Sequence, residues 1–170
     1  MKIVIDTNCL LSCIGKKSPF RNVFNAFIEN KFTICVNNEI ILEYEEIFER
    51  FWGTDVTNNL LGLFESSDNF EQVIVNYNWE LISKDKDDNK FVDTYIAANA
   101  DLLVSNDNSI TSLKNNSFPP LNIMKLEEFS DFFEDIKLPG YRGLAVPKHY
   151  SIASGDFTNK RNLLKTQNET

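Results

Sequence analysis

The chain has 170 residues, a net charge of −8 and 42% hydrophobic residues, with 14 phenylalanines among them. This composition excludes a disordered chain, a collagen-like chain and a disulfide scaffold, and it fits one domain with an aromatic core. The low pI of about 4.7 argues against a broad basic surface for duplex nucleic acid.

Strands and helices are predicted to alternate over the first 136 residues. Short β-branched runs predict strands at 2–5, 32–36, 79–82, 102–104 and 121–124. Helical spacing of apolar residues predicts helices after Ser18-Pro19, after Asn37 or Asn38, over 54–77, over 89–100 and over 126–136. Such alternation predicts an α/β fold, a three-layer α/β/α sandwich around a central, mainly parallel sheet.

The composition changes near residue 138. Pro and Gly become frequent there, and polar residues follow to the end of the chain. Residues 138–170 hold five basic and two acidic side chains, so they carry +3 and the rest of the chain carries −11. We therefore predict one domain over 1–137 and an extension over 138–170 that is at best partly ordered.

The chain has three cysteines, Cys9, Cys13 and Cys35. An odd number argues against a disulfide framework. The single histidine, His149, lies far from them, so a zinc site is not expected. An early charge at Lys2 and Asp6 argues against a signal peptide, and no apolar run is long enough for a membrane span. We therefore expect buried free thiols and a reducing cytoplasm.

Acidic residues stand where two of the predicted strands end. Asp6 follows the first strand and Asp107 follows the strand at 102–104, while Asp88 begins the helix between them. Ligands of open parallel sheets bind beyond the carboxyl ends of the strands. Converging carboxylates repel one another unless a cation neutralises them, and oxygen ligands favour Mg²⁺ or Mn²⁺. Helical projection turns Asp93 away from this group and predicts that it is solvated.

Each of these acids also fits a local structural role. Asp88 suits a helix N-cap, and an Asp at a strand end suits a turn. Asp6 and Asp107 at the ends of two strands in one sheet favour the functional interpretation.

Four segments, taken together, resemble the PIN-domain nucleases. The first is Ile3-Val4-Ile5-Asp6-Thr7-Asn8, and the second is the helical stretch Ile40-Ile41-Leu42-Glu43-Tyr44-Glu45-Glu46-Ile47. The third is Asp85-Lys86-Asp87-Asp88-Asn89-Lys90-Phe91-Val92, and the fourth is Ala100-Asp101-Leu102-Leu103-Val104-Ser105-Asn106-Asp107. They occur in the family's order, and the resemblance covers about residues 1–136. The most similar branch is the VapC-related toxins of bacterial toxin–antitoxin systems.

The resemblance implies a metal-dependent ribonuclease. Its implied catalytic residues are Asp6, Glu43, Asp88 and Asp107, with Asp6, Asp88 and Asp107 as ligands of Mg²⁺ or Mn²⁺. Its implied supporting residues are Asn8, Ser105 and Asp87, with Glu45 an alternative to Glu43 on helical periodicity alone. Nearby cations predicted to bind phosphate are Lys16, Lys17, Arg21 and Lys90. The implied partners are single-stranded or loop RNA, an antitoxin protein and a second copy of the chain.

Other classes remain open at this point. A haloacid-dehalogenase-like phosphatase also places Asp after its first strand, but Asn8 stands where it needs a second Asp. A phosphoacceptor receiver domain needs a late Lys that Lys125 matches poorly. A non-catalytic PIN-fold binding module is the remaining alternative.

Overall fold

The computed structural model describes residues 1–134. Its centre is a five-stranded parallel sheet in the order β3-β2-β1-β4-β5. The strands are β1 (Lys2–Ile5), β2 (Thr33–Val36), β3 (Phe70–Gln72), β4 (Leu102–Val104) and β5 (Ile123–Met124). The predicted α/β fold with a parallel sheet is therefore confirmed. The predicted domain boundary at 137 and the extension over 138–170 lie outside the described residues.

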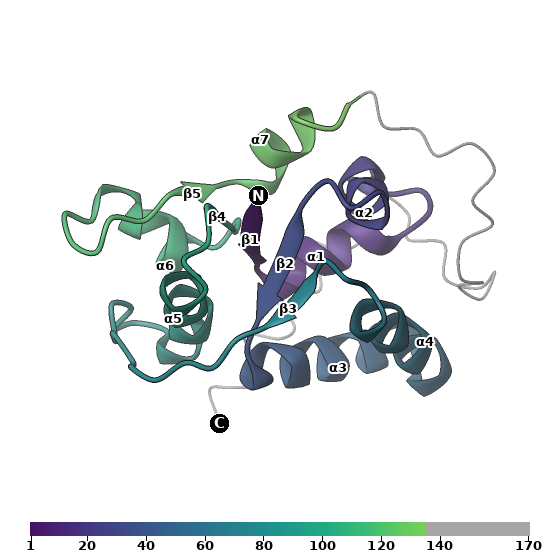
Figure 1. Cartoon of the computed structure of the whole chain (residues 1–170), viewed down its shortest axis with the longest axis horizontal. Coiled ribbons are helices and arrows are strands. Elements are labelled where there is room, and N and C mark those ends of the chain that lie inside the picture. The colour runs from purple at the N-terminus through teal and green to yellow at the C-terminus, as the bar shows by residue number, and fades with distance from the viewer. Residues whose placement is uncertain (135–170) are drawn as a thin grey trace.

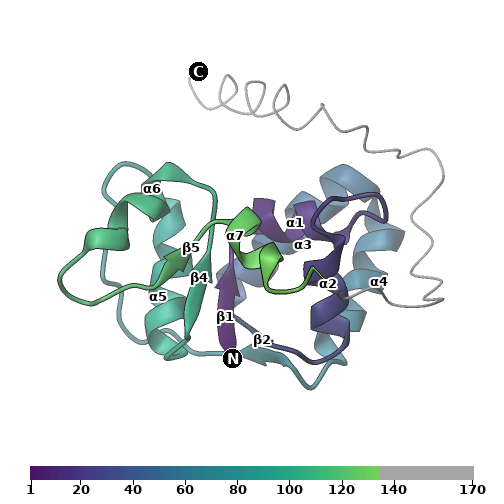
Figure 2. The ribbon, with the colours of Figure 1, turned by 90° about the horizontal axis from the view of Figure 1, so that it is seen from above.

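Helices cover both faces of the sheet (Figures 1 and 2). Helix α5 packs against β1, β2 and β4 and also contacts α3, and it lies on the opposite side of the strands from α1 and α2 (Figure 2). The helices are α1 (Thr7–Ile14), α2 (Arg21–Ile28), α3 (Asn38–Trp52), α4 (Thr54–Glu65), α5 (Asn89–Ala97), α6 (Asn108–Thr111) and α7 (Leu126–Asp131), with 3₁₀ turns η1 (Lys86–Asp88) and η2 (Ser112–Asn115). In residues 1–134 every helix is too short or too polar to span a bilayer.

Phenylalanine fills much of the core, as the composition predicts. Phe27 packs edge-on against Phe64 with ring centroids 5.5 Å apart, and Phe32 packs in the same way on Phe129 at 5.4 Å. Each such pair stabilises the fold by about 0.5–1.5 kcal/mol beyond the burial of its area. The first contact joins α2 to α4, and the second joins the residue before β2 to α7.

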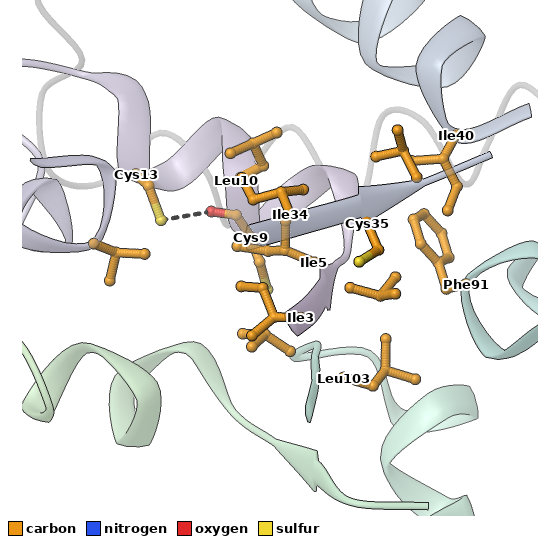
Figure 3. Packing of buried hydrophobic residues seen from close by; sticks show 14 of the residues in the cluster. Ile3, Ile5, Cys9, Leu10, Cys13, Ile34, Cys35, Ile40, Phe91 and Leu103 are labelled. Carbon is orange, nitrogen blue, oxygen red and sulfur yellow. Dashed lines mark hydrogen bonds between the residues drawn. The ribbon is translucent and has the colours of Figure 1, made fainter. Parts of the chain in front are cut away.

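The three cysteines are buried and free, as predicted. They lie among the aliphatic side chains at the centre of the molecule (Figure 3). The Cys13 thiol donates to the Cys9 carbonyl oxygen at 3.1 Å. Burial raises the pKa of Cys35 to about 11, so this thiol stays protonated and inert at neutral pH.

Helix α1 was not predicted from the sequence. It begins directly after β1, because the Asp6 side chain caps it by accepting from the Asn8 backbone N–H at 2.8 Å. Most of its side chains are buried, so it lacks the alternation of polar and apolar faces from which a helix is recognised. Helix α2 begins at Arg21, slightly later than Ser18-Pro19 suggested.

The predictions for residues 54–82 were partly wrong. A helix does occupy Thr54–Glu65, but a three-residue edge strand, β3, follows it where a helix was expected. The predicted strand at 79–82 does not form. The backbone N–H groups of Trp79 and Ile82 instead donate to the side chains of Asp93 and Asn89, so no neighbouring strand satisfies them.

The strand order reverses direction at β1. The chain passes from β1 to β2 and β3 on one side and then returns to β4 on the other side. A parallel sheet binds ligands at such a switch point, beyond the carboxyl ends of its strands. Asp6 and Asp107 follow β1 and β4 at this edge.

Candidate functional site

Asp6 and Ser105 join the ends of β1 and β4. Ile5 pairs with Val104, and the backbone N–H of Asp6 donates to the Val104 carbonyl at 2.9 Å. The Ser105 hydroxyl, fully buried, donates to Asp6 Oδ2 at 2.6 Å. This hydrogen bond therefore links the residue that follows β1 to the residue that follows β4.

Asp6 is a buried carboxylate in an acidic surrounding. Burial raises its pKa, the hydrogen bonds from Ser105 and Asn8 oppose that rise, and the charges of Glu43 and Asp107 add to it. A buried acid with a raised pKa among other acids is a feature of functional sites.

Asp107 is exposed at the N-terminus of α6. Its carboxylate accepts from the Ser109 backbone N–H at 2.7 Å, and its own backbone N–H donates to Ser105 Oγ at 3.0 Å. Ser105 thus connects the backbone of Asp107 to the carboxylate of Asp6, beside strand ends that the β1–β4 backbone pairing already holds together.

Asp88 lies near both of these acids. Partial burial raises its pKa to about 6, a hydrogen bond from Ser109 Oγ opposes that rise, and the charges of Asp85, Asp107 and Asp6 add to it. The charges of Asp107 and Asp6 both help to raise the pKa of Asp88, so the three carboxylates lie within electrostatic range of one another.

Glu43 reaches the site from α3. The neighbouring Tyr44, fully buried, donates its hydroxyl to the Ile5 carbonyl at 2.6 Å and so ties α3 to the end of β1. Glu43 is half-buried and faces the site, whereas Glu45 is exposed. The structure therefore places Glu43, rather than Glu45, beside the other acids.

Lys90 is a buried cation rather than a solvated one. Its side chain is 7% exposed, and its ammonium lies 2.8 Å from Glu43 Oε2 while also pairing with Asp87. Burial alone would lower its pKa, but the bonds to Asp87 and Glu43 outweigh burial and raise it. Lys90 therefore holds Glu43, and its charge is already compensated by protein carboxylates.

The remaining predicted residues are distributed around this centre. Asn8, Lys16 and Lys17 are exposed. The Arg21 guanidinium donates to the Ile14 carbonyl and to Asn25 Oδ1 and lies 4.6 Å over the Phe24 ring, so it connects α1 to α2.

The prediction that Asp93 is solvated was wrong. Asp93 is only 4% exposed, because the segment before α5 folds over it and Trp79 donates its backbone N–H to Asp93 Oδ1 at 2.9 Å. Helical projection from α5 alone could not include this covering segment.

The sequence of the chain matches a family model over this same region. The model is that of the PIN domain, and the match spans residues 2–109. The chain belongs to the PIN domain family. The matched region includes β1, α3, α5 and β4, and with them all four acidic positions of the resemblance.

The solved structures include a PIN-like relative with the same fold. It is the crystal structure of VapBC2 from Rickettsia felis bound to a DNA fragment from their promoter. The TM-score is 0.54 and the sequence identity 19%, and the similarity covers 74% of this chain and 98% of that chain. No curated protein sequence matches the chain.

PIN domains generally bind divalent metals, and the donors at this site have suitable chemistry. Asp6, Asp88 and Asp107 offer carboxylate oxygens, which suit Mg²⁺ or Mn²⁺. Burial raises the pKa of Asp6 and Asp88, neighbouring carboxylates add to the rise, and a bound cation would favour the charged form of both groups. Across residues 1–134, no three metal-binding side chains are already gathered at the spacing of a held ion.

Sequence reasoning missed the structural roles of three side chains at this PIN site, one of which, Lys90, was predicted only as a phosphate-binding cation. Tyr44 ties α3 to β1, Ser109 donates to Asp88, and Lys90 is buried against Glu43. Ser109 follows Asp107 by two residues, a spacing typical of an Asx turn, which could have identified it. The roles of Tyr44 and Lys90 depend on packing between α3, β1 and α5 and carry no local signal.

Proposed function

We propose that the chain is a metal-dependent endoribonuclease that hydrolyses RNA phosphodiester bonds. The observation that carries this proposal is the Asp6–Ser105–Asp107 connection at the switch point of a PIN-family sheet. Metal-dependent phosphodiester hydrolysis uses clustered carboxylates to hold cations beside the scissile phosphate, and the acids at this edge of the sheet suit that use.

Asp6, Asp88 and Asp107 would hold Mg²⁺ or Mn²⁺. When bound, such an ion lowers the pKa of a water and offsets charge on the phosphate. Ser105 orients the Asp6 carboxylate through its 2.6 Å hydrogen bond. Glu43 supports the site as a further acid, kept in place by Lys90 at 2.8 Å.

We further propose that the chain is the VapC-like toxin of a toxin–antitoxin pair. The fold similarity to VapBC2 and the acidic site support this proposal. An antitoxin with a basic side chain would complement the charge of Asp6, Asp88 and Asp107. A homodimer and a cytoplasmic location are proposed with it. The VapC-type substrate would be single-stranded or loop RNA, since net charge −8 disfavours a long duplex.

Cleavage of a labelled RNA panel with and without Mn²⁺ or Mg²⁺ tests the enzymatic proposal. We expect metal-dependent fragments from the parent protein, none with excess chelator, and none from Asp6→Asn. Glu43→Gln should lose most activity, whereas Glu45→Gln, an exposed acid on the same helix, should retain it.

The alternative is a non-catalytic PIN-fold binding module. Intact RNA across the panel with either metal, from a protein that melts cooperatively, would favour the module and overturn the nuclease. Cleavage that persists in Asp6→Asn would show that a contaminant or another site is responsible.

A further inference from the structure

Three aromatic side chains form an exposed cluster away from the acidic site. Tyr77 packs edge-on against Trp79 with ring centroids 5.3 Å apart, and Trp79 packs edge-on against Phe118 at 6.0 Å. Tyr77 is 67% exposed and Phe118 is 73% exposed, while Trp79 is half-buried between them. Two large exposed aromatic rings packed on a third, half-buried ring indicate a binding surface.

The backbone under this cluster is anchored. Trp79 donates its backbone N–H to the buried carboxylate of Asp93, and Ile82 exchanges two hydrogen bonds with the side chain of Asn89. On the other segment, Asn116 Nδ2 donates to the Phe118 carbonyl at 3.0 Å. Because the backbone under the rings is already fixed, binding of a ligand costs little conformational entropy there. The cluster is therefore preorganised as a binding surface.

The segments that carry the rings are free of acids, although the protein as a whole has 25 of them. Residues 73–79 contain no charged side chain. Residues 108–125 contain Lys114 and Lys125 and no Asp or Glu, and they also hold several asparagines. On a chain of net charge −8, these two segments add no negative charge of their own, and Glu80 directly follows the first of them.

Both segments lead from the cluster to the proposed catalytic site. One begins at Asp107 and reaches Phe118 through α6 and η2. The other presents Asn78 and Glu80 to a polar cavity of about 150 Å³, which the acids Glu39, Asp87 and Asp93 and the cation Lys90 also line. Lys90 in turn pairs with Glu43, so the aromatic cluster borders a polar surface that continues to the acids.

We propose that Tyr77, Trp79 and Phe118 are a stacking platform for unpaired bases of single-stranded RNA. The inference rests on the proposed function, because it takes RNA as the substrate. Aromatic side chains stack on any base, and stacking requires that the base be unpaired. The platform would therefore select single strands over duplexes and hold the strand beside the site where it is cut.

Binding of a labelled, unstructured oligoribonucleotide to full-length Asp6→Asn protein in chelator tests the platform without cleavage. The double variant Tyr77→Leu/Phe118→Leu keeps apolar bulk and removes two rings, and we expect its affinity to fall about 10-fold or more. The matched control Tyr77→Phe/Phe118→Tyr keeps both rings and should bind as the parent does. A duplex of equal length should bind more weakly than the single strand.

Equal binding by the leucine variant and the parent would overturn the platform, as would equal losses in the leucine variant and the ring-keeping control. Sedimentation without RNA provides a further check. If the leucine substitutions convert a dimer to a monomer, the cluster is an interface between copies and the platform is wrong. Binding is measured in chelator, so its result does not depend on cleavage. Failure to cleave RNA with Mn²⁺ would contradict the nuclease proposal and leave the binding result unchanged.

Discussion

The Ser105 hydroxyl lies 2.6 Å from Asp6 Oδ2 and also accepts the backbone N–H of Asp107. One small, buried side chain therefore satisfies a carboxylate from β1 and a backbone group beyond β4. The backbone pairing of β1 with β4 holds the strand ends together, and this connection orients the Asp6 carboxylate relative to the Asp107 backbone.

Replacing Ser105 by Ala should destabilise the protein by about 1–3 kcal/mol, since it leaves the buried carboxylate of Asp6 without one of its donors. Chemical denaturation measures the loss. Ser66→Ala, which removes an exposed hydroxyl at the end of α4, is the matched control and should change stability little. A Ser105→Ala protein as stable as the parent would show that Asp6 does not depend on this hydrogen bond.

The stability of the metal-free protein should depend on Asp88. Its pKa is raised from 3.8 to about 6 in the folded protein, so the folded state binds a proton more tightly than the unfolded state between these values. The free energy of unfolding contributed by Asp88 is therefore greatest at low pH and falls as pH rises from about 4 to about 6.

Urea denaturation in chelator across this pH range tests the effect. The parent should lose stability toward pH 6 relative to Asp88→Asn, which cannot ionise. Identical pH profiles for the two proteins would contradict a raised pKa at Asp88.

Removal of the buried Lys90 charge should destabilise the fold. Lys90→Met leaves Glu43 and Asp87 without their common cation, and a loss of about 1–3 kcal/mol is expected because Glu43 is partly buried. The double variant Lys90→Met/Glu43→Gln should recover part of that loss, since it removes the uncompensated charge. The exposed Lys114→Met serves as the control and should have little effect. No recovery in the double variant would show that the pairing with Glu43 is unimportant to stability.

The sequence predicted the strands that support the site more reliably than the side chains that organise it. Buried β-branched runs predicted β1, β2 and β4. Asn37, one of the two predicted N-caps of α3, does cap that helix. Helix α1 was missed because burial on nearly all sides removes the amphipathic pattern.

Long-range contacts account for the remaining differences. Asp93 is buried by a segment that precedes its own helix, and Lys90 is buried by carboxylates from two other elements. The projection of a single helix contains neither contact. The resemblance of four ordered motifs identified the family, and the match over residues 2–109 confirms it. The motifs could not indicate which nearby cations are already paired with protein carboxylates.

Binding of Mn²⁺ in solution tests the central claim most directly, because the claim is that Asp6, Asp88 and Asp107 share a divalent ion. Free Mn²⁺ can be followed by electron paramagnetic resonance during titration of the full chain. We predict that Asp6→Asn and Asp107→Asn each weaken binding at least about 10-fold. Asp101→Asn, at the opposite end of β4 where Asp101 accepts from the Lys2 backbone, should bind as the parent does. Equal Mn²⁺ affinity in the parent, Asp6→Asn and Asp107→Asn would contradict the account.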